Sequence, residues 1–314
     1  EPGDETVVGI AAGAPTDAFT TLNLGFTSSP IHVDIPRGHT ATGPVLVFHH
    51  TTQPHTATFP RVIVTVGENA DATVLEHHSS DDDANGLTVP VTELALDTAA
   101  RLDHLTVQAL GTTTHQIAHT ASTLQRDATL RSMAVALGGD YARLRTDTRL
   151  RGKGATSELL AVYFGERHQM HDFRTLQAHE APNTNSELLF KGAAEDQARG
   201  VYSGLIRIEK DAQKSNANQT NRNLVLSEGA HADSIPILEI EANEVRCNHA
   251  TAVGPIDDEQ RYYVESRGIP PHVAERLIVL GFFGEVLARV PRQLHTLEPM
   301  LRAQVAAKLQ RRTQ

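Results

Sequence analysis

A short polar turn that ends in alanine recurs along the first half of the chain at nearly constant spacing. The turns GENADA, LDTAARL, LQRDATL and RGKGATS carry Ala70, Ala99, Ala128 and Ala155, which lie 29, 29 and 27 residues apart. A repeat of this length is typical of a solenoid that builds one unit per coil. Small residues at the corners allow each coil to lie close to the previous one. The spacing becomes less regular later, where similar turns lie at Ala198, Ala212 and Ala230.

The segments between these turns alternate apolar and polar residues with the period of two that marks half-buried strands. Met133, Val135 and Leu137 share one face of their segment. In YARLRTDTRL, one face holds Leu144, Thr146, Thr148 and Leu150, and the other holds Arg143, Arg145, Asp147 and Arg149. The pattern recurs at 104–110, 158–164, 204–208 and 236–242. The sequence therefore predicts an all-β core, and the repeat favours a solenoid over a β-sandwich, which also contains many short strands.

Composition argues against several classes of protein. Aromatic residues make up 4% of the 314 residues and tryptophan is absent, which suits thin layers of stacked strands. A formal net charge of −10 argues against a nucleic-acid platform, which needs a basic surface. The single cysteine excludes an internal disulfide framework and fits a reducing compartment. Because nothing resembles a signal peptide and no apolar run approaches the roughly 20 residues of a membrane span, we expect a cytoplasmic protein.

The pattern changes from strands to helices near the C-terminus. Pro270 and Pro271 are suited to a helix start, and apolar residues follow at helical spacing until Pro291. A second helix is expected from Thr296, with apolar residues at intervals of four: Leu297, Leu301, Val305 and Leu309. The apolar face of the first helix is too wide for a helix that rests alone on the surface. Two interpretations remain open: the helices fold onto their own domain, or they form a docking module for another protein.

The segment EVRCNHATAVG contains the chain's only cysteine, Cys247, and a histidine two residues later, His249. The segment has the pattern of a strand, in which residues i and i+2 face the same side, so the thiol and the imidazole project together. Both are ligands for iron, zinc or an iron–sulfur cluster, but such sites usually need about four protein ligands. If the pair binds a metal, it is therefore only half of the site, and a partner must complete it. The alternative is that Cys247 is a small buried apolar residue, the usual role of a lone cysteine.

The other paired histidines are less convincing as metal ligands, because adjacent histidines on a strand face opposite ways and no helical HExxH frame is present. We expect surface or corner positions for His49, His50, His77, His78, His115, His119, His168 and His171. The acidic run 81–83 is expected to form a solvated turn. Stacked hydrogen bonds at coil corners are expected for Asn216, Asn218, Asn221 and Asn223. No Walker A motif or dinucleotide fingerprint is present, so ATP hydrolysis would belong to a partner.

Three long motifs lie in residues 172–268, and the last of them extends one residue further, to Ile269: DAQKSNANQTNRNLVLS, PILEIEANEVRCNH and YYVESRGI. Together they resemble the SufB/SufD family of iron–sulfur cluster assembly scaffolds, and in particular its SufD branch. The similarity is dense over this region and continues more weakly back to about Val45. SufB-type chains carry a cysteine in the segment occupied here by Asn221, and this departure favours the SufD branch.

The resemblance implies a right-handed parallel β-helix followed by a C-terminal α-helical domain. The expected parts are an N-terminal segment or linker over 1–40, where the family's N-terminal helical region is largely absent, a β-helix core over 41–255 and a helical domain over 256–314. A heterodimer with a SufB-like scaffold through the β-helices is implied, with a SufC-like ABC ATPase on the C-terminal helices. A homodimer of the isolated chain is a further expectation, whereas no nucleic-acid or membrane partner is expected.

The resemblance also assigns roles to residues. Cys247 and His249 match by motif the cysteine and histidine that the family places near the SufB interface, where they would hold a transient, nascent cluster shared with SufB. The residues expected to contact the ATPase are Ile278, Phe282, Phe283 and Val286. The expected function is a non-catalytic scaffold subunit that holds no tightly bound cofactor of its own. The alternative is a carbohydrate-active parallel β-helix enzyme, a lyase or hydrolase, which should show clustered charged residues and sugar-stacking aromatics on consecutive coils.

Overall fold

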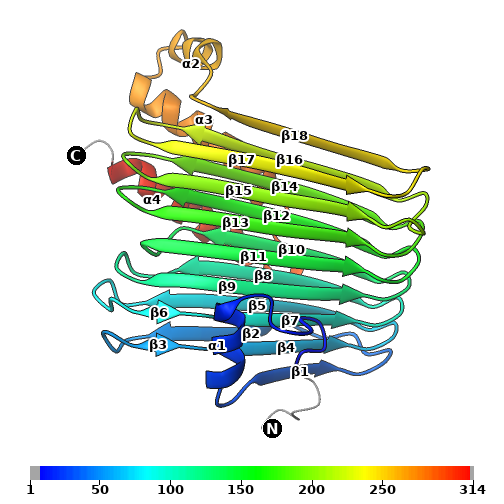
Figure 1. The fold of residues 1–314 in the computed structure, drawn as a ribbon. Coiled ribbons are helices and arrows are strands. Elements are labelled where there is room, and N and C mark those ends of the chain that lie inside the picture. The colour runs from blue at the N-terminus through cyan, green and yellow to red at the C-terminus, as the bar shows by residue number, and fades with distance from the viewer. Residues whose placement is uncertain (1–7, 312–314) are drawn as a thin grey trace.

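The computed structural model describes residues 8–311 and shows a chain wound into a β-solenoid, with helices packed against one side (Figure 1). Two parallel sheets, one of 10 strands and one of 8, run along the solenoid, and successive coils add strands to both. The predicted parallel β-helix with a C-terminal helical region is therefore confirmed. In the described residues, no helix is long and apolar enough to cross a membrane.

Sheet A is the sheet with 10 strands, and sheet B is the sheet with 8 strands. Sheet A contains β1 (Ile31–Ile35), β3 (Ala57–Thr58), β4 (Arg61–Val66), β6 (Leu87–Thr88), β7 (Val91–Leu96), β9 (His115–Leu124), β11 (Tyr141–Leu150), β13 (Met170–His179), β15 (Arg199–Ile208) and β17 (His231–Ile240). Sheet B contains β2 (Val45–Thr51), β5 (Asp71–Ser80), β8 (Arg101–Ala109), β10 (Thr129–Ala136), β12 (Thr156–Gly165), β14 (Asn185–Ala194), β16 (Asn216–Val225) and β18 (Arg246–Gly254). Each residue lies beside its equivalent in the next coil: Leu144 pairs with Phe173, and Phe173 with Tyr202.

The repeated turns place a small residue at a buried corner of successive coils. The corner residues Ala70, Ala100, Ala128 and Ala155 are at most 1% exposed. The sequence analysis placed one of these corners a residue too early, because Ala99 has a φ of 55° and occupies the left-handed turn position before the buried corner. Asn69 and Asp127 hold the same position in neighbouring turns, each with a φ of 57°. The coils approach so closely that a Cβ on Gly152 would lie 1.9 Å from the backbone nitrogen of Arg126.

The alternation predicted for β11 is confirmed. Leu144 faces the interior between the sheets and joins a buried cluster with Phe173 and Tyr202. Met133 and Val135 of β10 face the opposite way, out of the solenoid, yet are also buried. The outer face of sheet B is therefore apolar and covered. The alternation along a single strand does not show that another element covers its outward face.

The C-terminal helices are α2 (Asp258–Glu265), α3 (Pro271–Leu287), the 3₁₀ helix η2 (Arg292–Leu297) and α4 (Glu298–Arg311). Of these, α3, η2 and α4 cover the outer face of sheet B, whereas α2 packs against α3. The helix predicted from Pro271 is confirmed, and the second predicted helix begins as a 3₁₀ turn that continues into α4. The short helix α2 was missed, although Asp257 caps it and two acidic residues fill its first turn.

Apolar and charged contacts together fix α3 on the sheet. Phe283 and Val286 are fully buried in one cluster with Phe164 of β12. The Lys191 ammonium of β14 lies 2.5 Å from a Glu285 carboxylate oxygen and donates to the Phe282 carbonyl at 2.8 Å. The interpretation in which the helices fold onto their own domain is therefore confirmed for this face.

The N-terminal segment covers the outer face of sheet A, where α1 (Ala18–Phe26) crosses β4 and β7 (Figure 1). Glu93 of β7 accepts hydrogen bonds from the backbone N–H groups of Gly9, Ala11 and Ala12 at 2.9 to 3.0 Å. The Arg61 guanidinium donates to the same carboxylate at 2.6 Å. The first strand, β1, also lies in the segment 1–40 that we expected as a linker, and it extends sheet A by pairing with β4.

Acid should release the N-terminal segment from sheet A. Burial by itself raises the pKa of Glu93, but the three backbone amides and Arg61 outweigh it, so the pKa lies below the ordinary value. The stability that this contact contributes is therefore present above the ordinary glutamate pKa of about 4.3, and it is lost as the pH falls through the lower folded-state pKa. We expect the amides of residues 9–12 to be protected from hydrogen exchange at pH 7 and to lose protection below about pH 4.

Glu93→Gln should reduce this protection already at neutral pH, because it removes the charge that the buried Arg61 guanidinium requires. The expected loss of unfolding free energy is about 1–3 kcal/mol. Glu228→Gln, in an exposed turn, is the matched control. Equal protection of residues 9–12 at pH 7 and pH 3, after correction for intrinsic exchange rates, would contradict the assignment.

Candidate functional site

The last coil of the solenoid leaves two strand edges open. In the described residues, β17 pairs only with β15 and β18 only with β16, so each strand has one free edge. β18 carries both Cys247 and His249, opposite Ala217 and Gln219 of β16. Their side chains share one face of the strand, as the sequence spacing predicts. A free edge offers unpaired N–H and C=O groups to another chain.

Cys247 and His249 differ in their environment. Cys247 is partly buried beside Ile206 and Ala217, at the end of the solenoid core, and burial raises the pKa of its thiol. The protonated thiol is therefore favoured in the isolated chain, and a metal or cationic partner group must stabilise the thiolate. His249 is exposed. Among the described residues, no third histidine, cysteine or carboxylate joins these two in a metal-binding group, so the chain alone offers two ligands.

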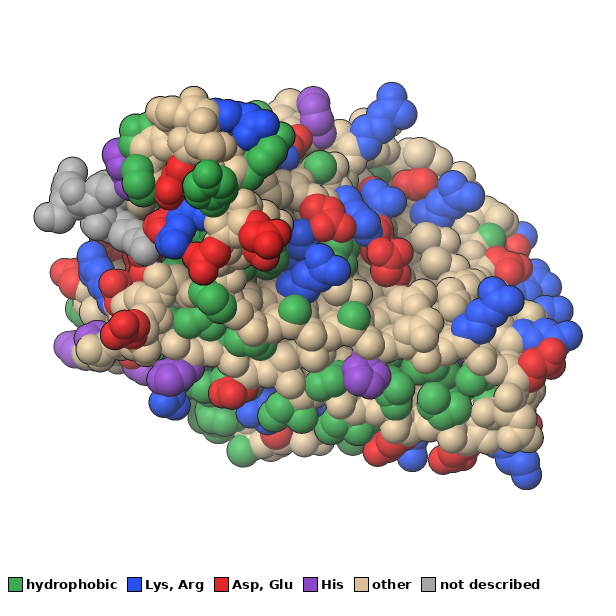
Figure 2. Space-filling view, turned by 90° about the horizontal axis from the view of Figure 1, so that it is seen from above, with side chains coloured by type: hydrophobic (Ala, Val, Ile, Leu, Met, Phe, Trp, Pro, Cys, Tyr) green, Lys and Arg blue, Asp and Glu red, His purple; other side chains and the backbone are tan. Residues whose placement is uncertain are grey.

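Apolar side chains are exposed around the same end of the solenoid. Ile235, Ile237 and Ile240 of β17 and Val253 of β18 are between 42% and 52% exposed. Figure 2 views the molecule from this end and shows hydrophobic side chains interspersed with charged ones. Clustered exposed apolar side chains of this kind mark surfaces that contact other proteins.

A second apolar surface lies between α2 and α3. An open groove of about 910 Å³ is lined by Leu224, Ile256, Tyr263, Val264, Ile278 and Phe282, among others. Two of the four α3 residues expected to contact a partner, Ile278 and Phe282, are thus partly exposed here. The other two, Phe283 and Val286, are fully buried against sheet B. Their burial disagrees with direct partner contact, because α3 would have to leave the sheet to expose them.

Of the histidines expected at surface or corner positions, three are buried instead and His49 is partly buried. His78, His119 and His171 are at most 5% exposed, and the His49 side chain is 17% exposed. His49, His78 and His171 face the polar interior of the solenoid, whereas His119 faces outward and lies beneath the N-terminal segment. The other four are at least partly exposed. Alternation along a strand predicts opposite faces for paired histidines but does not say which face is the interior.

The asparagines of β16 also depart from expectation, since they lie within the strand rather than at coil corners. Asn221 and Asn223 face the interior, where the Tyr163 hydroxyl donates to Asn223 at 2.6 Å and accepts from Asn221 at 3.0 Å. Asn218 faces outward and its side chain accepts from that of Asn248 at 3.2 Å. The acidic run 81–83 forms the exposed turn that was predicted.

Comparison with known proteins places the chain in a family. A family model described as SUF system FeS cluster assembly, SufBD core domain, matches residues 48–282, which include Cys247, His249 and most of the solenoid. An iron–sulfur cluster assembly SufBD family protein of Mycobacterium tuberculosis is 36% identical over 298 residues, covering 88% of this chain and 71% of the relative.

Two similar proteins carry the name iron–sulfur cluster assembly protein SufD. The Escherichia coli protein is 32% identical over 283 residues, covering 88% of this chain and 67% of the relative. The Bacillus subtilis protein is 29% identical over 277 residues, covering 87% of this chain and 63% of the relative. The chain therefore belongs to the SufBD family of iron–sulfur cluster assembly proteins.

Proposed function

We propose that this chain is the SufD-type scaffold subunit of a cytoplasmic complex with a SufB-like scaffold and a SufC-like ATPase, and that it performs no catalysis itself. Membership of the SufBD family supports a scaffold role in iron–sulfur cluster assembly. The observation that carries the finer proposal is the position of Cys247 and His249 on the open terminal coil. There the chain offers two ligands and a free strand edge together.

In the proposed heterodimer, the SufB-like subunit covers the terminal coil. The free edges of β17 and β18 supply backbone hydrogen-bonding groups, and Ile235, Ile237 and Val253 supply apolar area. A second copy of this chain offers an equivalent edge, so the same surface supports a homodimer when no SufB-like subunit is present.

The nascent cluster is cargo that the complex builds and passes on, rather than a resident cofactor. A Cys247 thiolate is a soft ligand suited to iron–sulfur chemistry, and the His249 imidazole is a weaker ligand that favours release. Because burial raises the pKa of the Cys247 thiol, its metal-binding form is favoured only when iron or a partner's cationic group displaces the proton. This behaviour suits a site that forms during assembly and is not permanently occupied.

The proposed ATPase contact is the groove between α2 and α3. Ile278 and Phe282 are accessible there, whereas Phe283 and Val286 hold α3 against sheet B. Lys191 links this helix to β14 through Glu285. A force applied to α3 by a nucleotide-driven partner would thus be transmitted directly to the solenoid.

His249→Ala should lower cluster formation by the complex without changing its assembly, because it removes a ligand from an exposed position. We expect about a tenfold or greater loss of affinity for iron, the order found when metal sites are disrupted. The measurement is iron and acid-labile sulfide bound per complex after anaerobic co-expression with the SufB-like and SufC-like partners.

Asn248→Ala is the matched control, because Asn248 is exposed on the opposite face of the same strand. Normal iron and sulfide content in the His249→Ala complex would remove His249 from the site. Failure of the wild-type chain to co-purify with either partner would contradict the proposed complex as a whole.

Ile278→Asp should weaken binding of the SufC-like ATPase by more than about 1 kcal/mol, because it places a charge in an apolar contact. Isothermal titration of the chain with the ATPase measures the effect. Leu277→Asp is the control, since Leu277 is 48% exposed on α3 and does not line the groove. Equal affinities for the two variants would show that the groove is not the contact surface.

A further inference from the structure

Four ionisable side chains from three successive coils meet inside the solenoid near its N-terminal end. His49 lies on β2, Glu76 and His78 on β5, and His104 on β8. Parallel register sets His49 beside His78, and their rings stack with centroids 4.7 Å apart. Glu76, His78 and His104 are at most 3% exposed. The cluster therefore belongs to the interior and is built by the coil stacking.

The two carboxylate oxygens of Glu76 have different histidine neighbours. His104 Nε2 lies 2.7 Å from Glu76 Oε1, and the Thr92 hydroxyl donates to both carboxylate oxygens at 3.0 and 3.1 Å. Glu76 Oε2 is 3.9 Å from His49 Nε2 and 3.8 Å from His78 Nε2. These separations are too long for hydrogen bonds. Carboxylates that bind metal ions are themselves held by hydrogen bonds of this kind.

The hydrogen bonds within the cluster do not satisfy all of its buried polar atoms. His49 Nε2, which faces the Glu76 carboxylate, is a buried atom without a hydrogen-bond partner. Within residues 8–311, the ion pairs of Glu76 involve only histidines. A buried carboxylate without a fixed cation is costly, and a bound metal ion would balance its charge.

The candidate ligand atoms converge, but they lie farther apart than the ligands of an occupied metal site. The candidate ligand atoms of His49, Glu76 and His78 lie within 4.8 Å of one another. Metal–ligand bonds of about 2.0–2.1 Å in a tetrahedral site place ligand atoms about 3.4 Å apart. Closing the two Glu76 gaps of 3.8 and 3.9 Å to that spacing requires shifts of a few tenths of an ångström. The two stacked imidazoles must move further, because their ring centroids lie 4.7 Å apart and the rings must turn for both nitrogens to face one ion.

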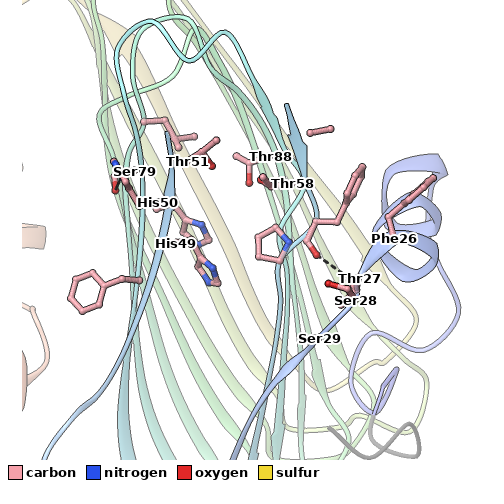
Figure 3. A pocket seen from close by; sticks show the side chains of 16 residues that line it. Phe26, Thr27, Ser28, Ser29, His49, His50, Thr51, Thr58, Ser79 and Thr88 are labelled. Atoms are coloured by element: carbon pink, nitrogen blue, oxygen red, sulfur yellow. Dashed lines mark hydrogen bonds between the residues drawn. The ribbon is translucent and has the colours of Figure 1, made fainter. Parts of the chain in front are cut away.

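The cluster is reachable from solvent. A pocket of about 510 Å³ is lined by His49 and His78 together with hydroxyl side chains such as those of Thr51, Thr58 and Thr88. Figure 3 shows the His49 side chain directed into this pocket, between strands of the two sheets. An ion could enter here, and a fourth coordination position would face the pocket.

We propose that His49, Glu76 and His78 bind one divalent first-row transition-metal ion, with His104 and Thr92 orienting the carboxylate. Two imidazoles and one carboxylate suit Fe²⁺ or Zn²⁺, whereas Mg²⁺ and Ca²⁺ prefer oxygen ligands. The site lies at the opposite end of the solenoid from β18 (Figure 1). It rests on the geometry of this chain alone and holds whether or not the proposed complex forms.

Metal titration of the full, untagged chain tests the site. After removal of metal with a chelator and dialysis, the chain is titrated with Co²⁺ as a spectroscopic probe, with Zn²⁺, and anaerobically with Fe²⁺. We expect one ion per chain, d–d absorption bands from bound Co²⁺ and a metal-dependent rise in melting temperature. The relative affinities for Zn²⁺ and Fe²⁺ identify the ion that the site prefers.

His49→Ala should weaken binding at least about tenfold and abolish the thermal shift. It should leave the fold intact, because the His49 Nε2 atom has no hydrogen-bond partner to lose. Glu76→Gln, which keeps the size of the side chain, provides a second variant if His49→Ala is poorly folded. His50→Ala is the matched control, because His50 is the neighbouring histidine and is exposed on the other face of β2.

Three results would overturn the proposal. They are the absence of saturable binding by any of the three ions, unchanged binding in the folded His49→Ala or Glu76→Gln variant, and an equal loss of binding in His50→Ala. The last result would show that the ion sits on surface histidines.

Discussion

In-register parallel pairing between coils is the constraint on which the rest of the molecule depends. Equivalent residues of successive coils lie about 4.8 Å apart, so any residue that faces inward is stacked on other inward residues. The corner alanines and Gly152 follow from this requirement, because a larger side chain there would hold the coils apart. The same stacking brings His49 over His78 and sets Cys247 against Ala217 at the end of the core.

The coverings of the two sheets decide which surfaces remain available. The outer face of sheet B is apolar and is sealed by α3 and α4, whereas the outer face of sheet A is covered near its beginning by the N-terminal segment through Glu93 and Arg61. In the described residues, open strand edges remain at the terminal coil, and an apolar groove remains beside α2. This distribution explains why a helix can be both part of the core and part of a contact surface: Phe283 faces the sheet, while Ile278 faces the groove.

The two ends of the solenoid offer different chemistry. At the terminal coil a partly buried thiol and an exposed imidazole stand at an unpaired strand edge, and the site we propose there needs ligands from another chain. Near the first coils, ligand atoms from β2 and β5 converge inside the solenoid, and support for the carboxylate comes from β7 and β8. The first arrangement suits transient handling of cargo between subunits, and the second suits an ion held by one chain.

The sequence by itself determined the strand period, the coil repeat, the helix from Pro271 and the shared face of Cys247 and His249, because each depends only on local periodicity. The family could also be recognised from the sequence, since its motifs are long and continuous. Only the tertiary structure decided which elements pack against the faces of these strands and helices. Local alternation did not show that Met133 lies under helices, that Phe283 is buried while Phe282 is accessible, or that Asn221 points inward. The cluster of His49, Glu76 and His78 was missed for the same reason: which face of a strand is the interior, and which residues one coil away complete a site, are set by how the coils stack.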